Sequence, residues 1–176
     1  LVVLQHPILV ENKNAAIQME ETLRAVKELS YPTIIVYPNI DAGNESIINI
    51  IEKYGRFDNI QIERNMERHV FISLLYHSSV LVGNSSCGIL EAPSLKLPAI
   101  NIGNRQRGRM QACNVINCDY ESNKIKSCIE KALKDSSFRE ELKKCVNPYG
   151  DGFSSERIVN VIRSVEINEE LLDKSI

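Results

Sequence analysis

The sequence predicts an α/β protein built on a Rossmann-like, doubly wound parallel sheet. Short apolar, β-branched runs alternate with longer amphipathic stretches along most of the chain, an order typical of βαβ units with helices on both faces of a sheet. In Val80–Glu91, a β-branched run stops at a loop rich in glycine and serine, and an apolar helical pattern follows. Strand, tight loop and helix start is the arrangement expected in a doubly wound sheet with right-handed crossovers.

The first third of the chain contains three predicted strands and two predicted helices. Leu1–Gln5 is an apolar run and forms the first predicted strand. In Ala15–Leu29 the apolar residues have helical spacing, with charged residues on the opposite side. Thr33–Tyr37 is β-branched and predicts the second strand, Glu45–Tyr54 a second helix, and Ile60–Glu63 a third strand.

The middle of the chain continues the alternation. Arg68–His77 predicts a helix, and Val80–Val82 is the strand that precedes the serine-containing loop. The apolar pattern after that loop predicts a helix over Gly88–Leu95. Ala99–Ile102 and Asn114–Asn117 then predict the last two strands.

The end of the chain is predicted to be helical. In Ser122–Lys134 the apolar residues share one face of a helix. A turn cluster over Asn147–Gly152 leads to a last predicted helix, Ser154–Val165, with a serine as its N-cap. We expect a single domain over residues 1–165, followed by a tail, Glu166–Ile176, that is helical or frayed.

Composition narrows the class of protein. With 176 residues the chain is long enough for one domain with a real core. The net charge of −2 disfavours nucleic acid as a partner, and no apolar run approaches the roughly 18 residues that span a membrane. The five cysteines include no C-x-x-C pair, so we expect neither a disulfide framework nor a metal site, and a reducing cytoplasm fits best.

The sequence lacks both the common enzyme motifs and an initiator methionine. The fingerprints of the common nucleotide-dependent and hydrolytic enzymes do not occur, and without a dinucleotide motif we expect no NAD or FAD and no other cofactor. The chain also opens inside a predicted strand without an initiator methionine. We therefore expect it to be an excised piece of a longer polypeptide.

The candidate chemistry lies in loops and helix starts at one edge of the sheet. In open parallel sheets, ligands bind outside the carboxyl ends of the strands. The residues at this edge that could bind or react are His6, Phe71, Ser85, Ser86, Glu91, Arg105 and Arg109. The two serines lie at a predicted helix start, where free backbone N–H groups attract an anion. The glutamate follows one to two turns later, within reach of a sugar diol, and phosphate next to ribose indicates a nucleotide.

Each of these residues also has a plainer explanation. The serines could be helix caps only, the glutamate a solvated carboxylate, the histidine a packed side chain and the phenylalanine a core residue. The two arginines point the same way only if their loop is extended; otherwise they sit in an exposed loop without a ligand. Cys87 at the helix start could be a thiol nucleophile or a small core residue.

Five collinear segments resemble the C-terminal half of the hydrolysing UDP-N-acetylglucosamine 2-epimerases of the sialic-acid pathway, and the resemblance extends over almost the whole chain. These segments are Gln5-His6-Pro7, Pro38–Gly43, Gly83–Ser94, Ile102–Arg109 and Asn147–Gly152. The Glu-Ala-Pro-Ser and Asn-Pro-Tyr-Gly-Asp-Gly elements are also similar to the non-hydrolysing bacterial epimerases. The Gly-Asn-Ser-Ser-Cys-Gly and Arg-Gln-x-Gly-Arg elements favour the hydrolysing branch.

The resemblance implies one half of a GT-B architecture, in which two Rossmann-like domains enclose a UDP-sugar. It places Ser85 and Ser86 at the diphosphate, Arg105 and Arg109 near the phosphates, Glu91 at the ribose hydroxyls, Phe71 near the uracil and His6 in the active-site cleft as the catalytic residue. With a pKa near neutrality, the histidine would transfer a proton or orient the sugar phosphate.

The reaction that the resemblance implies is elimination of UDP from UDP-GlcNAc, followed by hydration to free N-acetylmannosamine. The remaining catalytic carboxylates are expected on an N-terminal domain that this chain lacks, so we expect the isolated chain to be inactive. The complete enzyme is expected to be a homo-oligomer. Alternatives are a UDP-linked diacetamido-trideoxyhexose as substrate, a GT-B glycosyltransferase domain, or a non-catalytic nucleotide-sugar-binding module.

Overall fold

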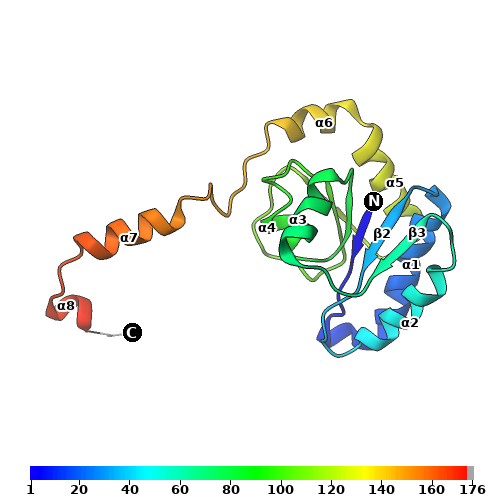
Figure 1. The fold of residues 1–176 in the computed structure, drawn as a ribbon, viewed down its shortest axis with the longest axis horizontal. Helices are drawn as coiled ribbons and strands as arrows, with labels where there is room; N and C mark the ends of the chain where they lie inside the picture. Colours follow the sequence, from blue (N-terminus) through cyan, green and yellow to red (C-terminus); the bar gives the residue numbers. More distant parts are fainter. Residues whose placement is uncertain (174–176) are drawn as a thin grey trace.

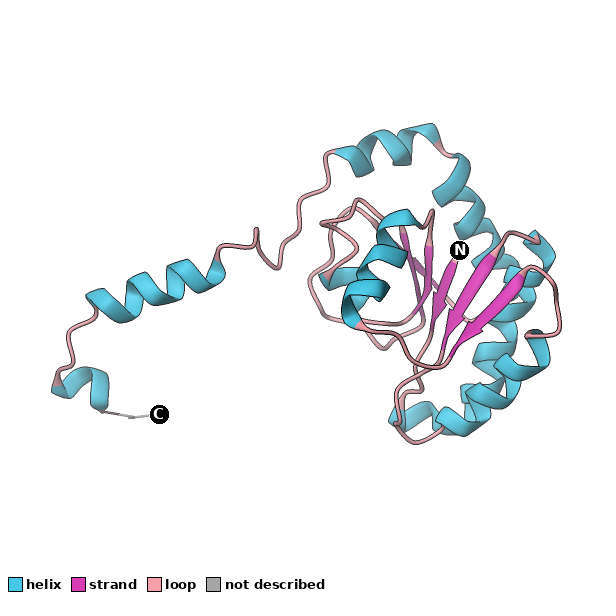
Figure 2. Cartoon of the chain, in the orientation of Figure 1, coloured by secondary structure: helices cyan, strands magenta, loops and turns pink. Residues whose placement is uncertain are grey.

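The computed structural model describes residues 1–173 and contains one parallel sheet flanked by helices (Figures 1 and 2). Its six strands are β1 (Val2–Leu4), β2 (Thr33–Val36), β3 (Ile60–Glu63), β4 (Leu81–Gly83), β5 (Ala99–Ile102) and β6 (Val115–Cys118). They lie in the order β3-β2-β1-β4-β5-β6, and every neighbouring pair is parallel. The predicted α/β fold class is confirmed.

The helices form two layers, one on each face of the sheet. On one face, α1 (Ala15–Leu29) packs between α2 (Asn44–Tyr54) and α5 (Ser122–Lys134), and their apolar residues meet alternate residues of the strands. On the other face, α3 (Arg68–His77) and α4 (Cys87–Leu90) cover a smaller apolar cluster. Both faces of the central strands are therefore buried, which explains their continuous apolar sequence.

The helix predicted over Gly88–Leu95 is wrong in its extent, because α4 ends at Leu90 and the chain continues through turns to Lys96. Pro93 explains the early end. A proline disfavours the helical conformation for the residue before it and clashes with the carbonyl one turn back. The following N–H groups accordingly bond three residues back, such as that of Ser94 to the Glu91 carbonyl at 3.1 Å.

Two helices were not predicted. A 3-10 helix, η1 (Leu9–Asn14), leads into α1, and none of its residues is buried, so its sequence shows no helical pattern of apolar residues. The second, α6 (Ser136–Lys143), follows α5 directly. Asp135 ends α5 and also begins α6, since its Oδ1 accepts a hydrogen bond from the Phe138 N–H at 3.1 Å.

The last helices lead away from the sheet. α7 (Ser154–Ser164) begins at the predicted residue and extends outward (Figure 1), and none of its residues is buried. Its N-cap is Phe153, so the prediction of a serine cap is wrong. A short helix, α8 (Glu169–Leu172), occupies part of the predicted tail, and its N-cap Asn168 accepts a hydrogen bond from the Leu171 N–H. The rest of the tail prediction, residues 174–176, lies outside the described residues. Among residues 1–173, no helix combines the length and apolar character needed to cross a bilayer.

Candidate functional site

The candidate site lies where the strand order reverses, between β1 and β4. These strands pair in register as far as Leu4 and Gly83, and both then end at the carboxyl edge of the sheet. His6 follows β1, and Asn84, Ser85 and Ser86 follow β4. Such a switch point leaves a crevice outside the strand ends, and this is where open α/β sheets bind their ligands.

His6 is held by its backbone and by its ring. Its N–H donates to Asn84 Oδ1 at 2.7 Å, and its carbonyl accepts from Asn84 Nδ2 at 2.9 Å. The ring Nδ1 accepts a hydrogen bond from the Asn39 N–H at 3.0 Å. This bond requires an unprotonated Nδ1, so the imidazole is neutral and carries its proton on Nε2.

Burial, and after it the positive charge of Arg105, lower the pKa of His6 from 6.5 to about 4, while Asp41 acts in the opposite direction. The expectation of a pKa near neutrality is therefore wrong for this chain. At neutral pH the ring is an uncharged hydrogen-bond donor through Nε2, which suits it to orient a phosphate or sugar oxygen, or to accept a proton only weakly.

The low pKa of His6 predicts how the stability of the folded chain depends on pH. In the unfolded chain the imidazole titrates near 6.5, so between pH 6.5 and pH 4 the unfolded state binds more protons than the folded one. Stability should therefore fall as the pH drops through this window. Denaturant unfolding at pH 7 and pH 4.5 should show a decrease in the free energy of unfolding that is about 2 kcal/mol larger for the wild type than for His6→Asn. Equal decreases would contradict a depressed pKa, since all other titrating groups are common to both proteins.

The two serines sit in the loop between β4 and α4 and are half-buried. Ser85 Oγ accepts a long hydrogen bond, 3.4 Å, from the Cys87 N–H, while the side chain of Ser86, the N-cap residue, makes no capping bond. The hydroxyl of Ser86 therefore does not serve as the helix cap that was the plainer explanation. Because α4 has only four residues, its dipole is small, and an anion here would depend on the hydroxyls, loop N–H groups and nearby arginines.

Cys87 does not have the character of a nucleophile. Its side chain is buried, and burial raises the pKa of the thiol to about 11. At neutral pH the reactive thiolate is therefore almost absent. The structure favours the second interpretation from the sequence, a small core residue at the start of α4.

Glu91 and Phe71 lie together on the α3 and α4 side of the sheet. Glu91 directly follows α4, and its Oε1 lies 3.7 Å from Nη1 of Arg68 at the start of α3. Phe71, one turn further along α3, is half-buried against the apolar cluster that contains Cys87. Arg68 was not predicted as a site residue. The one feature of the sequence that could have indicated Arg68 is its position in the first turn of a helix, where the helix dipole disfavours positive charge.

The β5–β6 loop brings Arg105 to the site but directs Arg109 elsewhere. Arg105 Nη1 donates to the Asn84 carbonyl at 3.3 Å. Arg109 Nη1 donates to Gln106 Oε1 at 3.0 Å, and its guanidinium lies 6.0 Å from the centre of the Tyr149 ring. The loop is folded into turns, with the Arg107 N–H bonded to the Asn104 carbonyl. The condition under which Arg105 and Arg109 would point the same way, an extended loop, is therefore not met.

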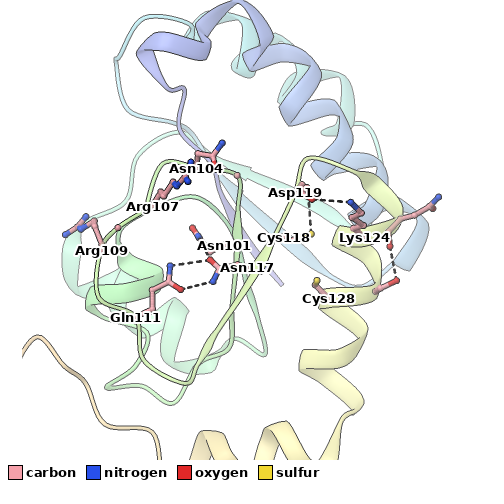
Figure 3. Close-up of a pocket in the computed structure, with 14 residues that line it drawn as sticks. Asn101, Asn104, Arg107, Arg109, Gln111, Asn117, Cys118, Asp119, Lys124 and Cys128 are labelled. Atoms are coloured by element: carbon pink, nitrogen blue, oxygen red, sulfur yellow. Dashed lines mark hydrogen bonds and ion pairs between the residues drawn. The ribbon is translucent and has the colours of Figure 1, made fainter.

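A large hollow lies beside the candidate site and does not include it. This open cavity of about 850 Å³ is lined by the β5–β6 loop, the end of β6 and the first turns of α5 (Figure 3). Figure 3 shows Gln111 and Asn117 joined by hydrogen bonds on one wall and Lys124 paired with Asp119 on another. Arg109 is the only predicted site residue that lines it. Within residues 1–173, no group of three or more histidine, cysteine or acidic side chains could hold a metal ion.

Comparison with known proteins places the chain in a family. The family model described as UDP-N-acetylglucosamine 2-epimerase matches residues 1–163. The chain is 32% identical over 171 residues to the UDP-N,N'-diacetylbacillosamine 2-epimerase (hydrolyzing) of Legionella pneumophila, covering 97% of this chain and 44% of that protein. It is also 32% identical over 161 residues to the UDP-N-acetylglucosamine 2-epimerase of Neisseria meningitidis, covering 92% of this chain and 42% of that protein. The chain thus spans less than half the length of these relatives.

Solved structures support the fold. The UDP-GlcNAc 2-epimerase of Neisseria meningitidis, bound to UDP-GlcNAc, has a TM-score of 0.73 at 19% identity over 93% of this chain and 45% of that one. The enzyme of Methanocaldococcus jannaschii, in complex with UDP-GlcNAc and UDP, has a TM-score of 0.73 at 20% identity over 93% of this chain and 44% of that one. With a family match that covers almost every residue of the sheet and its helices, the chain belongs to the UDP-N-acetylglucosamine 2-epimerase family.

Proposed function

We propose that this chain is the UDP-holding half of a hydrolysing UDP-sugar 2-epimerase, and that its substrate site opens toward a second, preceding half. The observation that carries the proposal is the grouping of His6, Arg105 and the two serines at the β1–β4 switch point, with Glu91 and Phe71 on the adjoining helices. A diphosphate at the serines would place a ribose near the carboxylate and a base near the aromatic ring.

The reaction is elimination of UDP across C1 and C2 of the sugar, followed by addition of water to release the free 2-epimer. As the C1–O bond breaks, negative charge grows on the β-phosphate of the leaving UDP. Arg105, the serine hydroxyls and the loop N–H groups stabilise this charge. The neutral His6 ring, with its proton on Nε2, is placed to hydrogen-bond an oxygen of the same group.

Removal of the weakly acidic C2 proton needs a positioned base, and hydration needs an acid and a base on the sugar. The grouping at the switch point supplies one imidazole, and Glu91 is engaged with the ribose in this assignment. The other acids and bases therefore come from the preceding half in our proposal. This also accounts for a candidate site that is an open edge of the sheet in this chain, with a large cavity lying beside it.

Two sugars are candidates for the substrate. The first is UDP-GlcNAc, with free N-acetylmannosamine as the product, which is what the family resemblance implies. The UDP-linked diacetamido sugar is the second candidate, because the Legionella relative named for it shares 32% identity over 97% of this chain. The complete enzyme, meaning this chain joined to its preceding half, should be assayed with both sugar nucleotides. Release of UDP together with a free sugar supports the proposal, and transfer of the sugar to an acceptor would identify a glycosyltransferase instead.

The ribose assignment of Glu91 can be tested on the chain alone. UDP should bind to this chain more weakly than to the complete enzyme, and Glu91→Ala should lose one bidentate, charge-assisted contact. We expect a further decrease in UDP affinity of about 1.5–3 kcal/mol, measured by isothermal titration calorimetry. Glu140→Ala removes an exposed, ion-paired carboxylate from α6 and should leave the affinity unchanged. Equal affinity of Glu91→Ala and wild type would remove the ribose assignment.

A further inference from the structure

We propose that Asn84 is a positioning residue, which fixes the distance between His6 and Arg105 across the serine loop. This inference rests on the proposed function, because it concerns how the same site is held together. Asn84 was not among the residues expected to take part in binding or catalysis. It is almost fully buried, with 1% of its surface exposed, directly between the end of β4 and Ser85.

The side chain of Asn84 pairs with the backbone of His6 just beyond the last backbone pair of β1 and β4. The pairing of β1 with β4 stops at Leu4 and Gly83. Gly83 turns the chain out of the strand with a φ of +137°, and Pro7 has no N–H to offer. The Asn84 amide takes the place of the missing backbone pair, because its Oδ1 accepts from the His6 N–H and its Nδ2 donates to the His6 carbonyl.

The backbone carbonyl of Asn84 binds the β5–β6 loop. It accepts hydrogen bonds from Gln106 Nε2 at 2.8 Å and from Arg105 Nη1 at 3.3 Å. Gln106 is equally buried, with 1% of its surface exposed, and Arg109 Nη1 donates to its Oε1. One residue thus joins the loop after β1 to the loop after β5, and the serine loop lies between them.

The two hydrogen bonds between the Asn84 side chain and the His6 backbone require an amide. Asparagine is the shortest side chain that offers a donor and an acceptor in one plane, as the two backbone groups of His6 demand. An aspartate keeps the acceptor but loses the donor, and an alanine loses both. The charges of Arg105 from the β5–β6 loop and of Asp41 from the loop after β2 both act on the pKa of the His6 ring, and its Nδ1 accepts a hydrogen bond from the Asn39 N–H. A shift of the His6 backbone would change the distance from the ring to all three, and displacements of about 1 Å are costly at reacting groups.

The test follows the titration of the His6 ring by NMR in the 176-residue chain, without ligand. In the wild type the ring should titrate far below its ordinary value. In Asn84→Ala the loop should loosen and admit water, and the pKa should return at least one unit toward 6.5. In Asn84→Asp a carboxylate contacts the His6 backbone, and the pKa should also rise by at least one unit. This second variant keeps the acceptor for the His6 N–H and remains informative if Asn84→Ala fails to fold.

Asn114→Ala provides the matched control. Asn114 is also fully buried, and its Nδ2 bridges two backbone carbonyls, those of Gly88 and Leu97, at 3.0 Å each. This variant should lower the melting temperature like Asn84→Ala but leave the His6 titration unchanged. If both Asn84 variants titrate like the wild type, or if Asn114→Ala raises the His6 pKa as much as they do, Asn84 has no positioning role. Failure of the wild type to bind UDP would instead count against the proposed function, because the titration needs no ligand.

Discussion

Replacing His6 with asparagine in the complete enzyme is expected to lower kcat at least about 10²-fold, with little change in UDP affinity. A positioned group that transfers a proton or orients the reacting phosphate contributes at least this much. Asparagine leaves the two backbone hydrogen bonds to Asn84 in place, so the serine loop and Arg105 should keep their arrangement. The measurement is a coupled assay of UDP release from UDP-GlcNAc.

His77→Asn is the matched control, since His77 is exposed near the end of α3 and should tolerate the change with normal kcat. The 176-residue chain should release no UDP in the same assay, because the proposed mechanism places further acids and bases in the preceding half. Robust turnover by this chain alone would overturn the half-enzyme proposal. A normal kcat for His6→Asn would leave His6 with a structural role only.

Gly83→Ala is expected to be the most destabilising single change near the site, at about 3 kcal/mol or more. A Cβ on Gly83 would lie 2.1 Å from the Leu4 carbonyl oxygen, a backbone atom that cannot move without separating β1 from β4. The φ of +137° adds strain for any residue with a side chain. Overpacking and left-handed backbone strain each cost about 1–3 kcal/mol. The difference in the free energy of unfolding between wild type and Gly83→Ala, from denaturant titration, measures the sum of these two costs.

Gly108→Ala separates strain from steric overlap. Gly108 also has a positive φ, +79°, but a Cβ there meets nothing within 4 Å. Its replacement should therefore cost only about 1 kcal/mol, the conformational part. If the two alanine variants are equally stable, the close approach of β4 to β1 does not constrain Gly83.

The regular elements were predictable because their signals are local. The apolar runs and amphipathic periods placed all six strands and most helices within a few residues of their observed ends. The grouping of His6 with Ser85 was also predictable, since parallel strands bring their carboxyl ends to one edge. The extent of α4 was wrong because the apolar pattern was given more weight than Pro93.

The residues that hold the site together left no comparable signal. Asn84 and Gln106 act through backbone carbonyls and amides of segments far away in sequence, and a loop asparagine or glutamine usually indicates only a turn. The direction of Arg109 depended on turns around Gly108 that spacing alone does not specify. The low pKa of His6 depends on burial and on Arg105, both of which are tertiary properties.

The pairing of β1 with β4 has a consequence for synthesis on the ribosome. The hydrogen bonds between His6 and Asn84 join residues 78 positions apart. At about 5–20 residues per second, β1 waits roughly 4–16 s after its own emergence before its second neighbour exists. Until then it can pair only with β2, and its other edge is exposed to solvent and to other nascent chains. The edge that carries the proposed site can therefore form only after β4 has emerged, and its hydrogen bonds report that the central strands β1 and β4 have paired.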